Sequence, residues 1–174
     1  MEEAAVGRKA RLGQSLLAFG LSALLWMLLA GSVQWEELMA AGIAGGLVVL
    51  VSGQKLRILG GIRFSPSAPL HLLRYLGAFS LALVRANLDM ARRVLSPSLP
   101  LNPAVVAVQT RLQSPLGRLL LANSITLTPG TLTVDVQGDR FLVHWVDCTP
   151  GKDLAAATQA IVRTLEEPLL GFLK

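Results

Sequence analysis

An uncharged stretch of 24 residues between Arg11 and Glu36 is the feature that most restricts what this chain can fold into. A helix needs about 20 apolar residues to cross the hydrocarbon core of a bilayer. A second uncharged stretch, of 17 residues, lies between Glu37 and Lys55, at the short end of the spanning range of about 17–25 residues. The pattern predicts a transmembrane hairpin with spans at about 12–32 and 38–54.

The composition agrees with a membrane protein. Of the 174 residues, 52% are hydrophobic and only 16% are charged, which is too apolar for an ordinary soluble domain. A cleaved signal peptide would have an apolar core of about 7–15 residues. The first apolar stretch is longer, and a second follows at once, so we expect the first to remain as an anchor. Gly42, Gly45 and Gly46 could contact either the neighbouring span or another helix.

The distribution of basic residues predicts the orientation of the hairpin. Basic residues flank its two outer ends, whereas the connection carries only Glu36 and Glu37; the flanking residues are Arg8, Lys9 and Arg11 before the first span and Lys55, Arg57 and Arg63 after the second. Because cytoplasmic loops are enriched in Lys and Arg, both ends and the loop at 55–68 are predicted to be cytoplasmic, in a multi-pass membrane protein. We assign the net charge of +5 to this orientation and expect no nucleic-acid partner.

A third apolar segment, at 69–95, is predicted to be an amphipathic basic helix. Arg74, Arg85 and Arg92 fall on one face at helical spacing. The uncharged window at 75–84 gives about 15 Å of helix, roughly half the hydrocarbon thickness. We therefore expect this helix to lie at the cytoplasmic interface, with its arginines toward anionic head groups, or to contact partner subunits. A third span remains the alternative if the Arg74 side chain extends to the membrane surface and Arg85 pairs with Asp89 one turn on.

A proline-rich segment at 96–103 is predicted to be a linker, followed at 104–174 by a small cytoplasmic α+β domain. The expected elements are a strand at 105–111, a helix from Pro115 to about Thr126, strands at 131–137 and 141–147, and a helix at about 153–167. The order is βαββα. The fold class is thus a helical membrane part, made of the hairpin and the amphipathic basic helix, followed by this domain.

The segment at 121–136 joins a helix to a strand through a forced turn, and its sequence is LANSITLTPGTLTVDV. Pro129 and Gly130 occupy the positions where a type II turn needs a fixed φ and then a positive φ. After the turn, polar Thr131, Thr133 and Asp135 alternate with apolar residues. This predicts a half-buried strand with one polar face.

This segment, placed after two hydrophobic spans in a chain of this size, resembles the E-type subunit of the multisubunit cation/proton antiporters, the Mrp or Mnh family. The resemblance covers most of the chain; residues 121–136 match specifically, and the flanking parts match in order and hydropathy. It implies an accessory subunit of the bacterial cell (inner) membrane, with other subunits as partners, in a complex that exchanges Na⁺, Li⁺ or K⁺ for protons.

Chemistry-bearing residues are sparse, and we predict no catalytic, cofactor or metal site. Ser124, His144 and Asp147 lack the strand-to-helix elbow that a nucleophilic serine needs, and Cys148 with two histidines gives no metal-ligand spacing. We instead expect subunit contacts. The candidate interface residues are Asn123, Thr128, Pro129, Gly130, Thr131, Thr133 and Asp135, and the candidate membrane-interface or partner-facing residues are Arg74, Arg85, Asp89 and Arg92.

The two spans contain no ionisable side chain, although ion paths through membranes normally depend on such groups. The sequence therefore predicts a non-enzymatic, non-translocating subunit that supports assembly or stability of the complex. The alternative is a free-standing binding module that is tethered to the membrane and carries a cytoplasmic domain.

Overall fold

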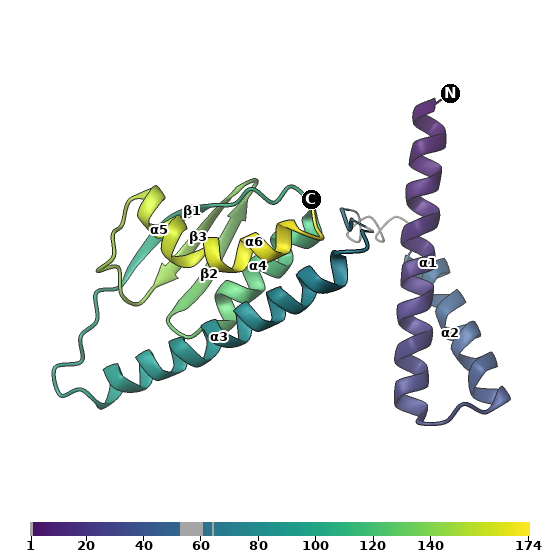
Figure 1. Ribbon diagram of the computed structural model, residues 1–174, viewed down its shortest axis with the longest axis horizontal. Coiled ribbons are helices and arrows are strands. Elements are labelled where there is room, and N and C mark those ends of the chain that lie inside the picture. Colours follow the sequence, from purple (N-terminus) through teal and green to yellow (C-terminus); the bar gives the residue numbers. More distant parts are fainter. Residues whose placement is uncertain (1, 53–60, 64) are drawn as a thin grey trace. The chain divides into compact units, whose positions relative to one another are not determined.

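The structure, a computed structural model, describes residues 2–52, 61–63 and 65–174 and divides into two compact units, Met1–Gly60 and Gly61–Lys174 (Figure 1). The first unit is a hairpin of helices α1 (Glu2–Ala30) and α2 (Trp35–Ser52). Within it, the stretches Leu12–Ala30 and Trp35–Ser52 have mean hydropathies of 1.8 and 1.4 and are long enough to cross a membrane. Both predicted membrane helices are therefore present.

Small residues let the two helices of the hairpin approach closely. A Cβ atom at Gly45 would lie only 2.9 Å from the Phe19 ring, so a larger residue there would require the ring or the helices to shift. Gly42 and Gly46 have no atom from another part of the chain within 4 Å of an added Cβ. Gly45 therefore faces the neighbouring span, and contact of Gly42 and Gly46 with another helix stays a prediction. At the loop end of the hairpin, the Trp26 indole donates to the Glu37 carboxylate at 2.9 Å.

The second unit has four helices and a three-stranded sheet. Its elements in chain order are α3 (Ala68–Leu95), β1 (Ala104–Gln109), α4 (Pro115–Leu127), β2 (Thr131–Gln137), β3 (Arg140–Trp145), α5 (Leu154–Ile161) and α6 (Arg163–Leu170). The strands are antiparallel in the order β1-β3-β2. The predicted helix at 153–167 is divided at Val162 into α5, which packs on β1, and α6, which packs on α3. After α3 the order is therefore βαββαα.

Local signals explain most of the boundaries. The Ser114 hydroxyl caps α4 by accepting from the Gly117 amide at 3.1 Å, and Pro115 occupies the first turn. Asp153 caps α5 in the same way. Gly138 turns the chain between β2 and β3 with φ at +62°, in the left-handed region that glycine tolerates.

Helix α3 belongs to the same compact unit as the α+β elements (Figure 1). Tyr75 is buried in the core formed by the inward side chains of the strands and of α4–α6, and Phe79 and Ala82 pack against this core. The sequence placed the start of the domain at residue 104. The compact unit begins at Gly61 because one face of α3 covers this core, so residues 96–103 form a loop inside the unit.

The orientation of β2 is the reverse of the expected one. Leu132 and Val134 are 50% and 58% exposed, whereas Thr131 and Thr133 are only partly exposed. The threonine hydroxyls donate to backbone carbonyls of α4 and of the turn, which satisfies their polarity inside the unit. Phe141 and Val143 of β3 are fully buried on the inner face.

Candidate functional site

The predicted turn between α4 and β2 has type II geometry. The Thr131 amide donates to the Thr128 carbonyl at 3.2 Å, and Gly130 has φ at +91°. Both threonine hydroxyls are used locally: Thr128 donates to the Ser124 carbonyl at 2.8 Å, and Thr131 donates to the carbonyls of Ile125 and Thr128 at 2.6 and 2.9 Å. The turn thus has no unused hydroxyl donor to offer a partner.

The other candidate interface residues fall into two groups. Thr133 donates to the Ala122 carbonyl at 3.1 Å, and its own amide donates to the Thr126 hydroxyl at 3.1 Å, so it ties β2 to α4. Asn123 and Asp135 are exposed. A β-bulge between Thr133 and Asp135 shifts the register of β2 against β3. The three polar residues predicted to share one face of the strand are therefore divided: Thr131 and Thr133 face inward, and Asp135 faces outward.

The arginines of α3 line one edge of its outward face. Arg74, Arg85 and Arg92 are all exposed, as the sequence predicted for a basic face. Asp89 pairs with Arg93, and the ion pair with Arg85 that would favour a third span is not formed. Next to this row the outward face is apolar, with side chains that are 47–66% exposed: Leu70, Leu73, Leu76, Leu81, Val84 and Leu88.

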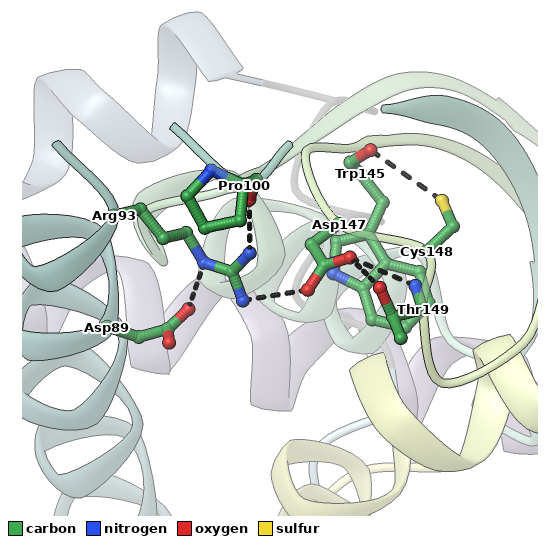
Figure 2. Close-up of polar contacts among 7 residues, drawn as sticks. All are labelled: Asp89, Arg93, Pro100, Trp145, Asp147, Cys148 and Thr149. Atoms are coloured by element: carbon green, nitrogen blue, oxygen red, sulfur yellow. Dashed lines mark hydrogen bonds and ion pairs between the residues drawn. The ribbon is translucent and has the colours of Figure 1, made fainter. Parts of the chain in front are cut away.

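Arg93, which the sequence did not single out, joins three separate segments (Figure 2). Its guanidinium donates to Asp89 at 2.7 Å, to Asp147 at 2.7 Å and to the Pro100 carbonyl at 2.9 Å. These bonds connect the end of α3 to the loop before β1 and to the segment after β3. The spacing of Asp89 and Arg93 was a visible signal for one of these contacts, whereas Pro100 follows in the next loop and Asp147 comes from a distant part of the chain.

The charged groups of this cluster shift one another's pKa values. Hydrogen bonds to Asp89 and Asp147 raise the pKa of the Arg93 guanidinium. The Thr149 hydroxyl, the Thr149 amide and Arg93 together lower the pKa of the Asp147 carboxyl (Figure 2). Asp147 therefore stays ionised at neutral pH and accepts from two segments at once.

Glu166 is a second polar centre that the sequence did not reveal. Its side chain is 1% exposed, and it accepts from the Thr110 hydroxyl and the Arg111 amide at 2.6 Å each and from Arg111 Nε at 2.9 Å. Because a buried carboxylate is costly unless it is paired and hydrogen-bonded, these contacts fix α6 to the end of β1. Glu166 resembles an ordinary surface residue in the sequence, because its partners lie about 55 residues away.

The polar groups described here bond to other parts of the fold. Ser124 Oγ lies 2.6 Å from the Tyr75 hydroxyl and donates to the Leu120 carbonyl, so Tyr75 is the donor of their shared bond. Ser124 is therefore occupied in the core, and Asp147 is occupied by Arg93 and Thr149. Within residues 2–52, 61–63 and 65–174, no cluster of His, Cys, Asp and Glu side chains could hold a metal ion.

A groove of about 380 Å³ lies between α3 and helices α5 and α6. Its floor is formed by the end of α4, the turn and β3, and its lining is largely apolar. The lining residues are Ala78, Leu81, Ala82, Arg85, Ala86, Asp89, Ile125, Thr128, Pro129, Thr131, Trp145, Ala160, Ile161, Thr164 and Leu165. The turn predicted at Pro129-Gly130 thus contributes to the floor of this groove.

Comparison with known proteins gives consistent matches. Residues 19–171 match a family model described as Na⁺/H⁺ ion antiporter subunit. The E1 subunit of the Na⁺/H⁺ antiporter of Staphylococcus haemolyticus is 32% identical over 152 residues, which are 83% of this chain and 92% of that protein. The corresponding E-type subunit of Alkalihalophilus pseudofirmus is 37% identical over 84 residues, 47% of this chain and 52% of that protein.

A solved structure is similar over nearly the whole chain. It is a chain in the structure of the membrane-bound sulfane sulfur reductase, an archaeal respiratory membrane complex. The two chains are 34% identical with a TM-score of 0.77, and the match covers 90% of this chain and 96% of that chain. The fold described above is therefore also found in a membrane complex of a different kind.

Proposed function

The chain belongs to the family of E-type Na⁺/H⁺ antiporter subunits, and we propose that within its complex it is a non-translocating accessory subunit that supports assembly. Membership in the family makes it a membrane protein and a subunit of an Mrp-type Na⁺/H⁺ antiporter. What remains to be assigned is its role among the other subunits.

The absence of ionisable side chains from the apolar parts of the two hairpin helices carries the proposal. Neither Leu12–Ala30 nor the part of α2 from Leu38 to Ser52 contains a charged residue or a histidine. A path for protons or sodium through a membrane normally needs such side chains. The similarity to a chain of a respiratory membrane complex supports the same view, because a scaffold can serve complexes of different chemistry more readily than an ion path can.

Expression of the chain alone tests this role directly. Vesicles that contain only this subunit should show no Na⁺ or K⁺ exchange in response to a pH gradient, and vesicles with the full set of subunits should show it. In native gels the tagged chain should migrate with its companions as a particle of several hundred kilodaltons. Exchange by the subunit alone would contradict the proposal, and a small particle would favour the free-standing binding module.

The hairpin offers a surface for a companion helix. Gly42 and Gly46 are four residues apart on α2 with no neighbour within 4 Å of an added Cβ, and small residues at this spacing allow helices to approach closely in a bilayer. Replacing both with leucine should reduce the amount of companion subunits that co-purify. Gly20→Leu, on α1 and equally open, is the matched control and should leave co-purification unchanged.

We further propose that the second unit is cytoplasmic and that α3 lies at the membrane surface. The outward leucines of α3 would enter the interface while Arg74, Arg85 and Arg92 reach anionic head groups. The packed face of α3 argues against a third span, because Tyr75 and Arg93 bind polar partners across the unit. A protease added to inverted vesicles should cleave the second unit. Cleavage only in right-side-out vesicles would defeat this topology.

A further inference from the structure

The groove between α3 and helices α5 and α6 has the size and lining of a ligand site. Its volume of about 380 Å³ lies in the range of about 300–1,000 Å³ that is typical of small-molecule pockets. On the α3 side it is lined by Ala78, Ala82 and Ala86, whose short side chains leave the space open. The opposite wall carries Ile161 and Leu165.

Two of the three threonines that line the groove offer no free hydroxyl donor, and the third, Thr164, is exposed. The hydroxyls of Thr128 and Thr131 donate to backbone carbonyls of α4 and the turn. Asp89, at the rim, is held by Arg93 at 2.7 Å. Apart from the Thr164 hydroxyl, an occupant therefore meets mainly methyl groups, the Pro129 ring and the Trp145 indole, which favours an apolar chain.

The rim is different, because it carries one available cation. Arg85 is exposed and has no ion-pair partner among the residues that the structure describes. An arginine beside an apolar groove matches an amphiphile with an anionic head and an apolar tail. Arg85 also stands in the row with Arg74 and Arg92 that borders the outward leucines of α3, so the groove opens beside the surface assigned above to the membrane.

We propose that this groove holds one acyl chain of an anionic phospholipid, with the phosphate of its head group on Arg85. The proposal rests on the membrane-surface placement of α3, which brings bilayer lipids to the rim. It assigns a shared function to the turn at 128–131 and to the alanines of α3: together they form the floor and one wall of a lipid site.

Trp145 lies in the lining of the groove and provides the measurement. The chain has three tryptophans, and the other two, Trp26 and Trp35, are in the hairpin. The full chain with Trp26→Phe and Trp35→Phe would be reconstituted in vesicles of phosphatidylglycerol with brominated acyl chains. Bromine quenches indole emission on contact, so the Trp145 emission should fall relative to vesicles of unbrominated lipid.

Matched variants on one helix distinguish the groove from the general surface. Ala160→Leu fills the groove and should abolish the quenching of Trp145. Ala155→Leu is also at an exposed alanine of α5 but outside the groove, and it should leave the quenching intact. Arg85→Gln should reduce quenching by brominated phosphatidylglycerol toward the lower value expected with brominated phosphatidylcholine. The proposal would be overturned if brominated phosphatidylglycerol and brominated phosphatidylcholine quenched Trp145 equally and neither Ala160→Leu nor Arg85→Gln changed the quenching.

A second reporter separates this proposal from the placement of α3. A single tryptophan introduced as Leu88→Trp on the outward face, with Trp145→Phe, should be quenched if α3 lies on the bilayer. Quenching at position 88 but not at Trp145 would mean that the groove holds no lipid while the placement stands. No quenching at either position would overturn both. If Trp145 were quenched in the isolated chain but not in the assembled complex, the lipid proposal would be overturned, and a segment of a companion subunit would be the occupant of the groove.

Discussion

Single residues hold the second unit together through bonds that cross between segments. Arg93 joins α3 to two loops, Glu166 joins α6 to β1, and the Tyr75 hydroxyl joins α3 to α4 at Ser124. Each of these polar groups is paired, as buried polar groups must be to avoid a cost of about 1–3 kcal/mol. Their contribution is to specify one arrangement of the helices around the sheet.

Gly130 is required by its backbone conformation. Because φ is +91° and an added Cβ would lie 3.3 Å from Met90 Cε, Gly130→Ala should lower the free energy of unfolding by about 1–2 kcal/mol. The control is Gly77→Ala on α3, where nothing lies within 4 Å; alanine should raise stability there by about 1 kcal/mol or less. Urea unfolding followed by Trp145 emission, in the Trp26→Phe and Trp35→Phe background, measures both. Equal stability of Gly130→Ala and the parent would refute the turn geometry.

The Asp147 cluster predicts a dependence of stability on pH. Because Thr149 and Arg93 lower the pKa of Asp147 in the folded state, its contribution is complete above the ordinary carboxyl pKa of about 4 and is lost as the pH falls through the lower folded value. Asp147→Asn should therefore be less stable than the parent at pH 7, and the difference should shrink on acidification to about pH 3. Glu167→Gln, an exposed carboxylate outside the cluster, should behave like the parent at pH 7. A constant difference at all pH values would exclude the ion pair as the cause.

At the scale of elements, the sequence predicted the segments better than their faces. The strands expected at 131–137 and 141–147 agree with β2 and β3 to within two residues, because the turn signal at Pro129-Gly130 and the alternation of side chains act over a few neighbouring residues. Alternation with period two divides a strand into two faces but does not say which one is buried. In β2 the threonine face is buried because the hydroxyls of Thr131 and Thr133 donate to carbonyls of α4. These hydrogen bonds exist only in the folded unit, so the sequence pattern does not reveal them.

In the candidate site, too, the sequence predicted local features but not contacts between distant segments. The exposure of Arg74, Arg85 and Arg92 followed from helical spacing alone. The groove and the ion pair of Arg93 with Asp147 did not, because they combine α3 with residues from Ile125 to Leu165, far along the chain. Sequence periodicity contains no information about such contacts between distant segments.

The orientation of β2 can be tested with one substitution at two positions. Val134 is 58% exposed and Val143 is 0% exposed. Val134→Thr should change the free energy of unfolding by no more than about 0.5 kcal/mol, whereas Val143→Thr buries a hydroxyl without a partner and should cost about 1–3 kcal/mol. Urea titrations of the two variants give the comparison. A larger loss at Val134 would restore the orientation first expected from the sequence.

At the scale of the whole molecule, the chain consists of a membrane hairpin and a unit with its own core. The second unit is closed by contacts between its two ends: Ile62 bridges Leu173, the Arg63 amide donates to the Phe172 carbonyl at 2.8 Å, and Leu173 is fully buried. Helix α3 contributes Tyr75 to the same core. The unit is therefore complete only with the residues that precede the proline-rich loop.

Two fragments test this division. A fragment of residues 61–174 should unfold cooperatively in urea, because it keeps every member of the core around Tyr75. A fragment of residues 104–174 lacks α3, exposes the surface that Tyr75 and Phe79 cover, and should aggregate or unfold without a sharp transition. Circular dichroism and analytical ultracentrifugation record both outcomes. A stable, monomeric 104–174 fragment would show that the domain starts where the sequence alone suggested.

The chain contains one cysteine, and Cys148 is 3% exposed, with its thiol 3.7 Å from the Trp145 carbonyl. Alkylating reagents act on accessible thiolates, so they will modify cysteines introduced at exposed sites and spare the native one. Spin labels at exposed Leu47 on α2 and Leu88 on α3 can therefore be attached without first removing a thiol. The unaltered sequence is a ready background for spectroscopy that follows the distance between hairpin and second unit while the antiporter turns over.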